Sequence, residues 1–196
     1  RLSEEPAVVE PIEEIGQYGG SLQGPHLGRS PQYTRITYEP LVRWNLETDK
    51  VIPNVAKSWK ISNGGKVITF YLRKGMKWSD GEPFTADDII FWYEDITLNK
   101  DLTPVFPAWL IAGGKPGKVE KVDNYTVRFV FDVPYTFLLQ RIASGQDCYA
   151  PKHYLKKFHP KYTSMDEIMK QAKEEGFDAW YKLFSTKATR WQNKAL

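Results

Sequence analysis

The sequence contains one cysteine, three histidines and no long apolar run, and each scarcity narrows the classes of protein it can encode. Cys148 alone cannot form a disulfide within the chain, and a lone cysteine is typically a small buried apolar side chain. With a mean hydropathy of −0.50 and no stretch of about 18 apolar residues, the sequence predicts no transmembrane helix. The net charge of +3 is small and no lysine or arginine tract occurs, so we expect no nucleic-acid partner.

Patterns that carry catalysis are also missing. His26, His153 and His159 belong to no HExxH or CxxC pattern, so we expect no metal site, with His153 and His159 on the surface. Neither a phosphate-binding P-loop nor a dinucleotide fingerprint occurs, and we expect no cofactor. Asp87 and Asp88 are explained by helix capping, whereas a glycan-cleaving enzyme needs two cleft carboxylates at a set separation. The sequence therefore predicts no catalytic residues and no enzymatic activity.

Aromatic residues are plentiful. Seven Trp, eleven Tyr and ten Phe occur among 196 residues, and 41% of the chain is hydrophobic. A chain of this size buries roughly 70% of its unfolded surface, so most of these rings are expected in a core. Trp44, Trp59 and Trp78 are expected to serve packing, because a Trp ring buries a large apolar area.

The segment from Val67 to Ile96 organises the rest of the chain. Val67 to Leu72 is rich in β-branched and aromatic residues, which predicts a strand, and Asp80-Gly81 predicts a turn. Thr85 is the expected N-cap of a following helix, and Asp88 completes a capping-box pattern. The helical period places apolar residues on one broad arc and acidic residues on the other. Phe91 falls within the acidic arc, which indicates a second contact surface.

Other elements follow from turn and capping signals. A short helix, or a helix that runs into a turn, is expected from Arg35 to Val42, with Glu39 placed to pair with Arg43 four residues later. Asn63-Gly64-Gly65 predicts a hairpin turn. The remaining predicted elements are strands at 119–122 and 125–133 joined at Asp123-Asn124, and helices at 134–143, 164–175 and 178–186.

Five short motifs occur in a fixed order between Tyr38 and Trp92. They are Tyr38-Glu39-x-Leu41, Pro53 to Ala56 followed by Ser58-Trp59, Phe70-x-Leu72-Arg73-Lys74-Gly75, Asp80-Gly81, and Thr85-Ala86-Asp87-Asp88. In order and spacing this region resembles family 5 extracellular solute-binding proteins. These are the oligopeptide-, dipeptide- and nickel-binding components of bacterial ABC importers, and some relatives take oligosaccharides.

The resemblance implies an α/β fold, a mixed sheet with helices, of the periplasmic binding protein-like type II class. It covers most of Gly19 to about Leu155, which is the front part of the family pattern. We therefore expect a partial structure, with one lobe plus part of its neighbour. The expected division is a flexible lead-in at 1–18, parts of the first lobe at 19–38 and 146–196, an inserted subdomain at 39–145, and a second ligand-binding lobe absent from this chain.

The resemblance also implies where a ligand binds. In the oligopeptide binders, the loop before the Tyr-Glu-x-Leu motif lines the cleft, which points to His26, Gly28 and Arg29 here. An aromatic residue after the central helix also reaches the cleft, which points to Trp109, with Phe106 beside it. Core packing remains the alternative for Trp109.

The implied function is capture of an oligopeptide or oligosaccharide in the periplasm or extracellular space, by closure of two lobes, and delivery to ABC permease subunits in the membrane. A ligand-sensing or scaffold domain and a nickel-chelate binder are the alternatives. Because both lobes contribute to affinity, this chain alone is expected to bind ligand weakly or not at all.

Overall fold

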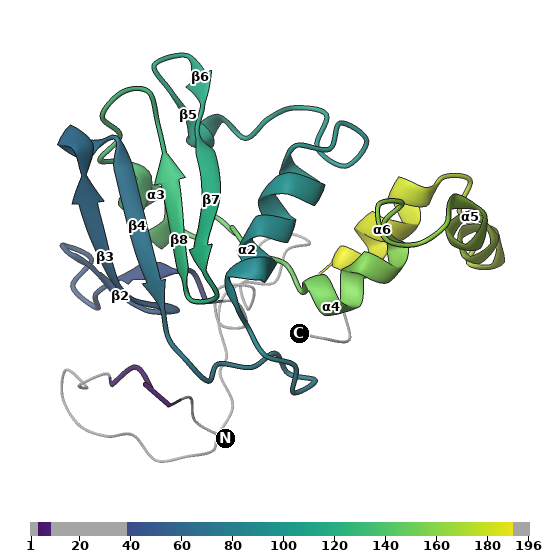
Figure 1. Cartoon of the computed structure of the whole chain (residues 1–196), viewed down its shortest axis with the longest axis horizontal. Coiled ribbons are helices and arrows are strands. Elements are labelled where there is room, and N and C mark those ends of the chain that lie inside the picture. The colour runs from purple at the N-terminus through teal and green to yellow at the C-terminus, as the bar shows by residue number, and fades with distance from the viewer. Residues whose placement is uncertain (1–3, 9–38, 190–196) are drawn as a thin grey trace, which may run out of the picture.

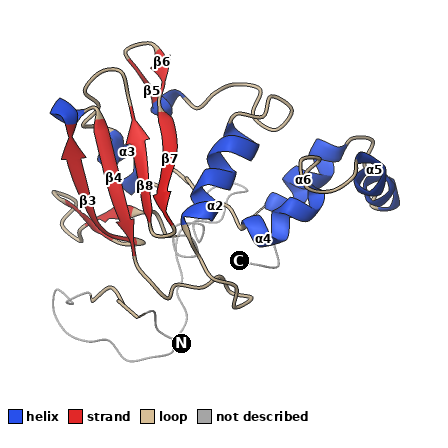
Figure 2. Cartoon of the chain, viewed as in Figure 1, coloured by secondary structure: helices blue, strands red, loops and turns tan. Residues whose placement is uncertain are grey.

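The computed structural model describes residues 4–8 and 39–189. Its main body is a four-stranded antiparallel sheet with helices beside and behind it, followed by a separate group of helices near the C-terminal end (Figure 1). The mixed sheet-and-helix fold expected from the sequence is confirmed (Figure 2). Within the described ranges, no helix combines the length and apolar character that crossing a membrane requires.

The sheet has the strand order β3-β4-β8-β7. Its strands are β3 (Ala56–Ser62), β4 (Val67–Leu72), β7 (Lys118–Asp123) and β8 (Thr126–Val130). The turn η1 (Asn63–Gly65) joins the first two, and Gly64 has a φ of +61°, which favours glycine. Both predicted hairpins, at 63–65 and at Asp123-Asn124, are confirmed.

Strict alternation along β4 places the core on one face of the sheet. Ile68, Phe70 and Leu72 are buried, whereas the residues between them are half-buried. On the neighbouring strand, Phe129 meets Phe70 edge-to-face with ring centroids 5.5 Å apart. Trp59 and Trp78 pack on or within this core, and Cys148 is completely buried, as the sequence predicts.

The central helix begins at its predicted cap. Thr85 accepts a hydrogen bond from the backbone of Asp87, and the Asp88 carboxylate accepts one from the backbone of Thr85. The helix α2 (Ala86–Phe91) continues as a π-helical turn, η2 (Trp92–Thr97), and together they cover the predicted span. α2 packs against β7 and β8.

The prediction of a helix from Arg35 to Val42 is wrong for residues 39–42, the part that the structure describes. Residues 35–38 lie outside the described residues, and β1 (Val42–Trp44) is a strand paired with β2 (Val51–Pro53). Glu39 does not pair with Arg43; its carboxylate accepts a hydrogen bond from Asn54 at 2.6 Å. The physical reason is that Glu39 precedes Pro40, whose ring disfavours helical geometry for the residue before it.

Short elements close the far end of the sheet. A one-turn helix, η3 (Ala108–Leu110), leads into a small hairpin of β5 (Ile111–Ala112) and β6 (Lys115–Pro116). α3 (Leu138–Ala143) lies behind the sheet and packs against β1 and β2 (Figure 1). It begins later than predicted because the backbone N–H of Tyr135 is hydrogen-bonded to the carbonyl of Gly65, which holds residues 134–136 outside a helix.

The C-terminal helices are α4 (Lys152–Leu155), η4 (Lys156–Phe158), α5 (Met165–Glu174) and α6 (Trp180–Ala188). α5 matches its prediction, with Ser164 as N-cap and Gly176 at φ +84° just beyond its end. α6 begins two positions after the predicted Asp178, whose carboxylate instead pairs with Lys182 at 2.6 Å. Of these helices, α4 and α6 contact the side of α2 that faces away from the sheet, and α5 packs on α6 (Figure 1).

Phe91 forms the centre of that contact. It is buried, and its ring lies near those of Tyr162 and Phe184, with centroids 6.1 and 6.5 Å away. The second contact surface predicted from an aromatic residue within the acidic arc is therefore confirmed.

Candidate functional site

The predicted ligand-binding aromatics Trp109 and Phe106 lie in the region that follows the central helix. Both side chains are half-buried and pack against the core. Trp109 stacks on Trp92 with ring centroids 5.9 Å apart and an angle of 21° between the planes. Its carbonyl accepts a hydrogen bond from the Tyr135 hydroxyl at 2.8 Å, which fixes the local backbone.

This geometry gives Trp109 two environments. The indole stacks on Trp92, which is buried, while Trp109 itself is half-buried. A half-buried aromatic ring that is held by a neighbouring ring loses little side-chain freedom when it stacks on a flat ligand. Val105, beside Phe106 in the chain, is 82% exposed. A ligand role for Trp109 and Phe106 stays a prediction.

The other predicted residues, His26, Gly28 and Arg29, lie outside the described residues. Of the predicted ligand-binding residues, the structure therefore describes Trp109 and Phe106.

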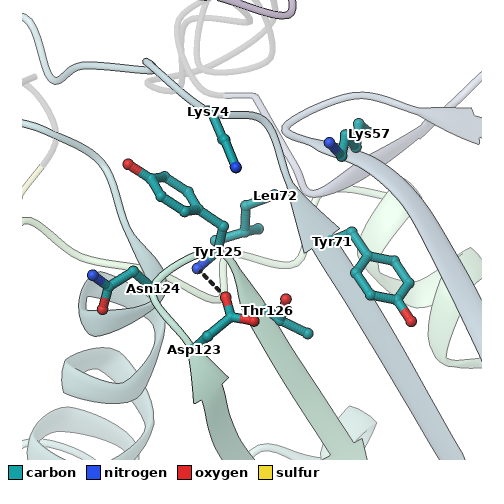
Figure 3. A pocket seen from close by; sticks show the side chains of 8 residues that line it. All are labelled: Lys57, Tyr71, Leu72, Lys74, Asp123, Asn124, Tyr125 and Thr126. Atoms are coloured by element: carbon teal, nitrogen blue, oxygen red, sulfur yellow. Dashed lines mark hydrogen bonds between the residues drawn. The ribbon is translucent and has the colours of Figure 1, made fainter.

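Two depressions occur at the opposite end of the sheet. The first has a volume of about 550 Å³ and is shown in Figure 3. The rings of Tyr71 and Tyr125 flank it, and Lys74 places its ammonium group 5.8 Å from the Tyr125 ring centroid. The remaining lining residues are Lys57, Leu72, Asp123, Asn124 and Thr126.

Its rim is held in place by the hairpin turn. The Asp123 carboxylate accepts a hydrogen bond from the backbone N–H of Tyr125 at 2.7 Å, and this bond lowers the pKa of Asp123. Aromatic faces beside ammonium and carboxylate groups can contact a polar ligand that has a flat face. Sequence reasoning missed this depression because its residues come from β3, β4 and the β7–β8 turn, which only the sheet brings together.

The second depression, of about 620 Å³, lies beside the first residues of the chain. Pro6 and Ala7 form one wall, and the others include Arg73, Met76 and Trp78. Its complete lining adds Glu39, Asn54, Val55, Gly75, Lys77, Ser79 and Gly81.

Two titratable pairs or groups illustrate the structural role of such side chains here, the His153–Asp80 contact and the Cys148 thiol. Nε2 of His153 lies 2.7 Å from the Asp80 carboxylate, and the contact helps to lower the pKa of Asp80 against the opposing effect of burial. Burial raises the pKa of the Cys148 thiol. Across residues 4–8 and 39–189 there is no group of three His, Cys, Asp or Glu side chains that could hold a metal ion.

The predicted surface position of His159 is wrong. Its ring is buried, with Nε2 3.1 Å from the carbonyl of Asp95 and Nδ1 accepting the backbone N–H of Lys161 at 3.2 Å. Burial lowers the pKa of His159. The physical reason is that the ring packs between η2 and α6, where it contacts Phe184 and Trp180 edge-on.

Known proteins match the chain over most of its length. The family model described as bacterial extracellular solute-binding proteins, family 5 Middle, matches residues 50–186. The periplasmic alpha-galactoside-binding protein of Rhizobium meliloti is 37% identical over 72% of this chain and 20% of its own. The dipeptide-binding protein of Escherichia coli is 31% identical over 60% of this chain and 24% of its own.

Solved structures agree. A structure described as oligopeptide-binding protein OppA covers 96% of this chain and 30% of its own, with a TM-score of 0.85 and 45% identity. The stachyose complex of the periplasmic binding protein MelB from Agrobacterium fabrum covers 70% of this chain and 22% of its own, with a TM-score of 0.59 and 34% identity.

The chain thus spans between a fifth and a third of the length of these relatives, all of which carry the names of binding proteins. The family model covers well over half of the chain, and the fold agrees with that of periplasmic binding proteins over the same region. The chain belongs to the family 5 bacterial extracellular solute-binding proteins.

Proposed function

We propose that this chain is the front part of the substrate-binding component of an ABC importer. It would act in the periplasm or extracellular space, capture an oligopeptide or oligosaccharide between two closing lobes, and deliver it to the permease subunits. The observation that carries the proposal is the match to an oligopeptide-binding structure over 96% of the chain, at a TM-score of 0.85. Periplasmic binding proteins close their domains around a ligand by a hinge motion.

The proposed division places the sheet and its central helix, 39–145, in an inserted subdomain. Residues 146–196 and 19–38 would belong to the first ligand-binding lobe. The separation of the sheet from the group α4–α6 in Figure 1 supports this division for the described residues. The second lobe would come from the part of the relatives that this chain does not span.

Two ligand classes have support. The oligosaccharide class is supported by the names of the alpha-galactoside-binding relative and the stachyose complex, and by the partly exposed Trp109. The peptide class is supported by the dipeptide-binding relative and the oligopeptide-binding structure. Flat aromatic faces suit a sugar ring, whereas a peptide requires backbone hydrogen bonds and charged groups for its termini.

A nickel-chelate binder and a sensor or scaffold domain are the remaining alternatives. NikA from Brucella suis, solved with Fe(III)-EDTA, is 28% identical to this chain over 67% of it, with a TM-score of 0.51. A chelate can be held by aromatic and charged side chains without direct protein ligands, so it belongs in the binding test.

The test is a chimera in which this chain replaces the matched part of the oligopeptide-binding protein. Thermal unfolding is followed with short peptides, stachyose and a nickel chelate, because a ligand that binds only the native state raises the melting temperature. We expect a folded chimera stabilised by peptides or by stachyose, and no shift for this chain alone. A chimera with cooperative unfolding that responds to neither class would overturn the proposal.

The contribution of Trp109 is tested in the same chimera. Trp109→Ala is expected to weaken binding about 5- to 30-fold, the effect of losing one well-packed aromatic contact. Tyr181→Ala is the control, because Tyr181 is an exposed aromatic residue on α6, an element that contains no predicted ligand-binding residue. Equal affinity for the two variants would assign Trp109 to packing.

A further inference from the structure

The N-terminal residues Glu4–Val8 lie against the end of the sheet, although they are far from it in sequence. Arg73, just after β4, donates from Nη1 to the carbonyl of Glu5 at 2.9 Å and to that of Pro6 at 3.3 Å. The guanidinium is itself fixed, because its Nε donates to the carbonyl of Asn54 at 2.6 Å. Arg73 is therefore oriented by the sheet unit to receive backbone carbonyls of an extended segment.

The Glu5 side chain is recognised separately from its backbone. Nζ of Lys57, on β3, donates to both carboxylate oxygens at 2.8 and 2.9 Å, and the backbone N–H of Lys74 lies 3.5 Å from one of them. The hydrogen bond from Lys57 lowers the pKa of Glu5. Both partners of the ion pair are partly exposed, so the pair alone would contribute little.

Gly75 allows the segment to approach the sheet closely. A Cβ atom built on Gly75 would lie 2.9 Å from both the backbone nitrogen and Cγ of Glu4, and its φ of +73° already favours glycine. The two depressions described above flank the segment, since Lys57 and Lys74 line one, and Pro6 and Ala7 line the other. The sheet unit thus contacts the segment in three ways. It binds two backbone carbonyls and one carboxylate of the segment, and Gly75 leaves room for the segment's backbone.

We propose that Lys57, Arg73 and Lys74 form a recognition site for an extended acidic segment, and that the chain's own Glu4–Ala7 occupies it as a latch. The chemistry it recognises is a glutamate carboxylate followed by backbone carbonyls that have no partner within their own segment. The Glu5 carboxylate pairs with Lys57 at 2.8 Å and the cationic Arg73 binds the backbone of the same segment, which together supply the charge complementarity. The site does not depend on the identity of the transported ligand.

A spin label tests the latch in the intact chain. Val8 is 87% exposed and accepts a label as Val8→Cys, whereas the natural Cys148 is buried and its raised thiol pKa keeps it unreactive. We expect the label to broaden the amide signals of Lys57 and Lys74. Lys57→Gln is expected to reduce the ratio of chains with the segment bound on the sheet to chains with it released. The expected reduction is about two- to fivefold, the range for partly exposed ion pairs.

The matched control is Glu120→Gln. Glu120 pairs with Arg128 at 2.9 Å on the same sheet, with similar exposure, and contacts nothing in the latch. This variant should leave the broadening unchanged. Raising the ionic strength should weaken the broadening in the parent chain, because exposed charges are screened.

Charge reversal separates recognition from simple proximity. Lys57→Glu should release the segment, and adding Glu5→Lys to it should restore the broadening; Gly75→Ala should release it by steric exclusion. Circular dichroism confirms that each variant is folded. Absence of broadening in the parent chain, or broadening that persists in both Lys57→Glu and Gly75→Ala, would overturn the proposal.

Discussion

Asp88 and Asp95, on the same helical run, hold two separate parts of the segment that begins the C-terminal group of helices. Asp88 accepts a hydrogen bond from the backbone N–H of Lys152 at 3.0 Å. Asp95 accepts one from Nζ of Lys161 at 2.7 Å and one from the hydroxyl of Tyr162 at 2.5 Å. Both aspartates are buried, so the group α4–α6 is docked on α2 and η2 by polar contacts as well as by Phe91.

Replacing Asp88 by Asn should destabilise the protein although the two side chains have the same shape. The carboxylate uses both oxygens, one for the Thr85 N–H at 2.9 Å and one for the Lys152 N–H. Asn keeps one acceptor and turns an NH₂ donor toward the other N–H, so one buried bond becomes a donor–donor contact. We expect a loss of about 1–3 kcal/mol in the free energy of unfolding by urea denaturation.

The control for this variant is Asp87→Asn on the same helical turn. Asp87 pairs with Lys121 at 3.0 Å at a partly exposed position, and its loss should cost about 0.2–1 kcal/mol. Equal losses for the two variants would mean that the buried Asp88 carboxylate stabilises the fold no more than the partly exposed Asp87–Lys121 pair.

Asp95→Asn should change the ionisation of Tyr162. Burial and the hydrogen bond to the Asp95 carboxylate together raise the pKa of Tyr162 to about 12. Without the carboxylate charge, this pKa should fall toward the ordinary tyrosine value of about 10. Ultraviolet titration of phenolate absorbance measures the change, and Asp178→Asn, which removes an exposed pair with Lys182, should leave it unaltered.

Acidification should destabilise the protein through His159. Burial lowers its pKa in the folded state below the unfolded value of about 6.5. Between the two pKa values the unfolded chain binds more protons, so the stabilising contribution is complete above about pH 6.5 and is lost as the pH falls through the folded pKa. Protonation also places a second N–H opposite the backbone N–H of Lys161, which Nδ1 now accepts.

The measurement is the difference in unfolding free energy between the parent chain and His159→Gln from pH 7.5 to 5. A difference is needed because Asp88 also titrates. Burial raises the pKa of Asp88, so its protonation at lower pH increases the free energy of unfolding, opposite to the effect of His159. A difference that does not vary with pH would exclude His159 as the titrating group.

The sequence predicted the elements whose signals are local. The run of β-branched and aromatic residues predicted β4, and the Thr85–Asp88 box predicted the start of α2, because both signals depend on neighbouring residues only. The strand β1 was missed because its pairing with β2 is a tertiary contact that overrides a weak helical pattern next to Pro40. The late start of α3 likewise depends on a bond from Tyr135 to distant Gly65.

The candidate site shows the same limit. A family resemblance pointed to Trp109. Its stacking on Trp92 could not be predicted, because the loop between η2 and η3 brings the two rings together and no periodic sequence pattern links them. The latch site on Lys57 and Arg73 joins residues more than fifty positions from Glu5, and the motif that contains Arg73-Lys74-Gly75 does not show which distant segment packs against it. The burial of His159 was missed because the sequence around it is polar and only packing against α6 encloses it.

Phe91 should determine whether the helices α4–α6 stay docked. Phe91→Ala removes a fully buried ring from their contact with α2 and should cost about 3–5 kcal/mol. Because the sheet has its own core around Phe70 and Phe129, the loss should be local. Hydrogen exchange should show amides of α4 and α6 losing protection while those of β4 and β8 keep theirs. Phe129→Ala is the matched control, with protection lost throughout the sheet; the same uniform loss in Phe91→Ala would mean that the helices and the sheet unfold as one unit.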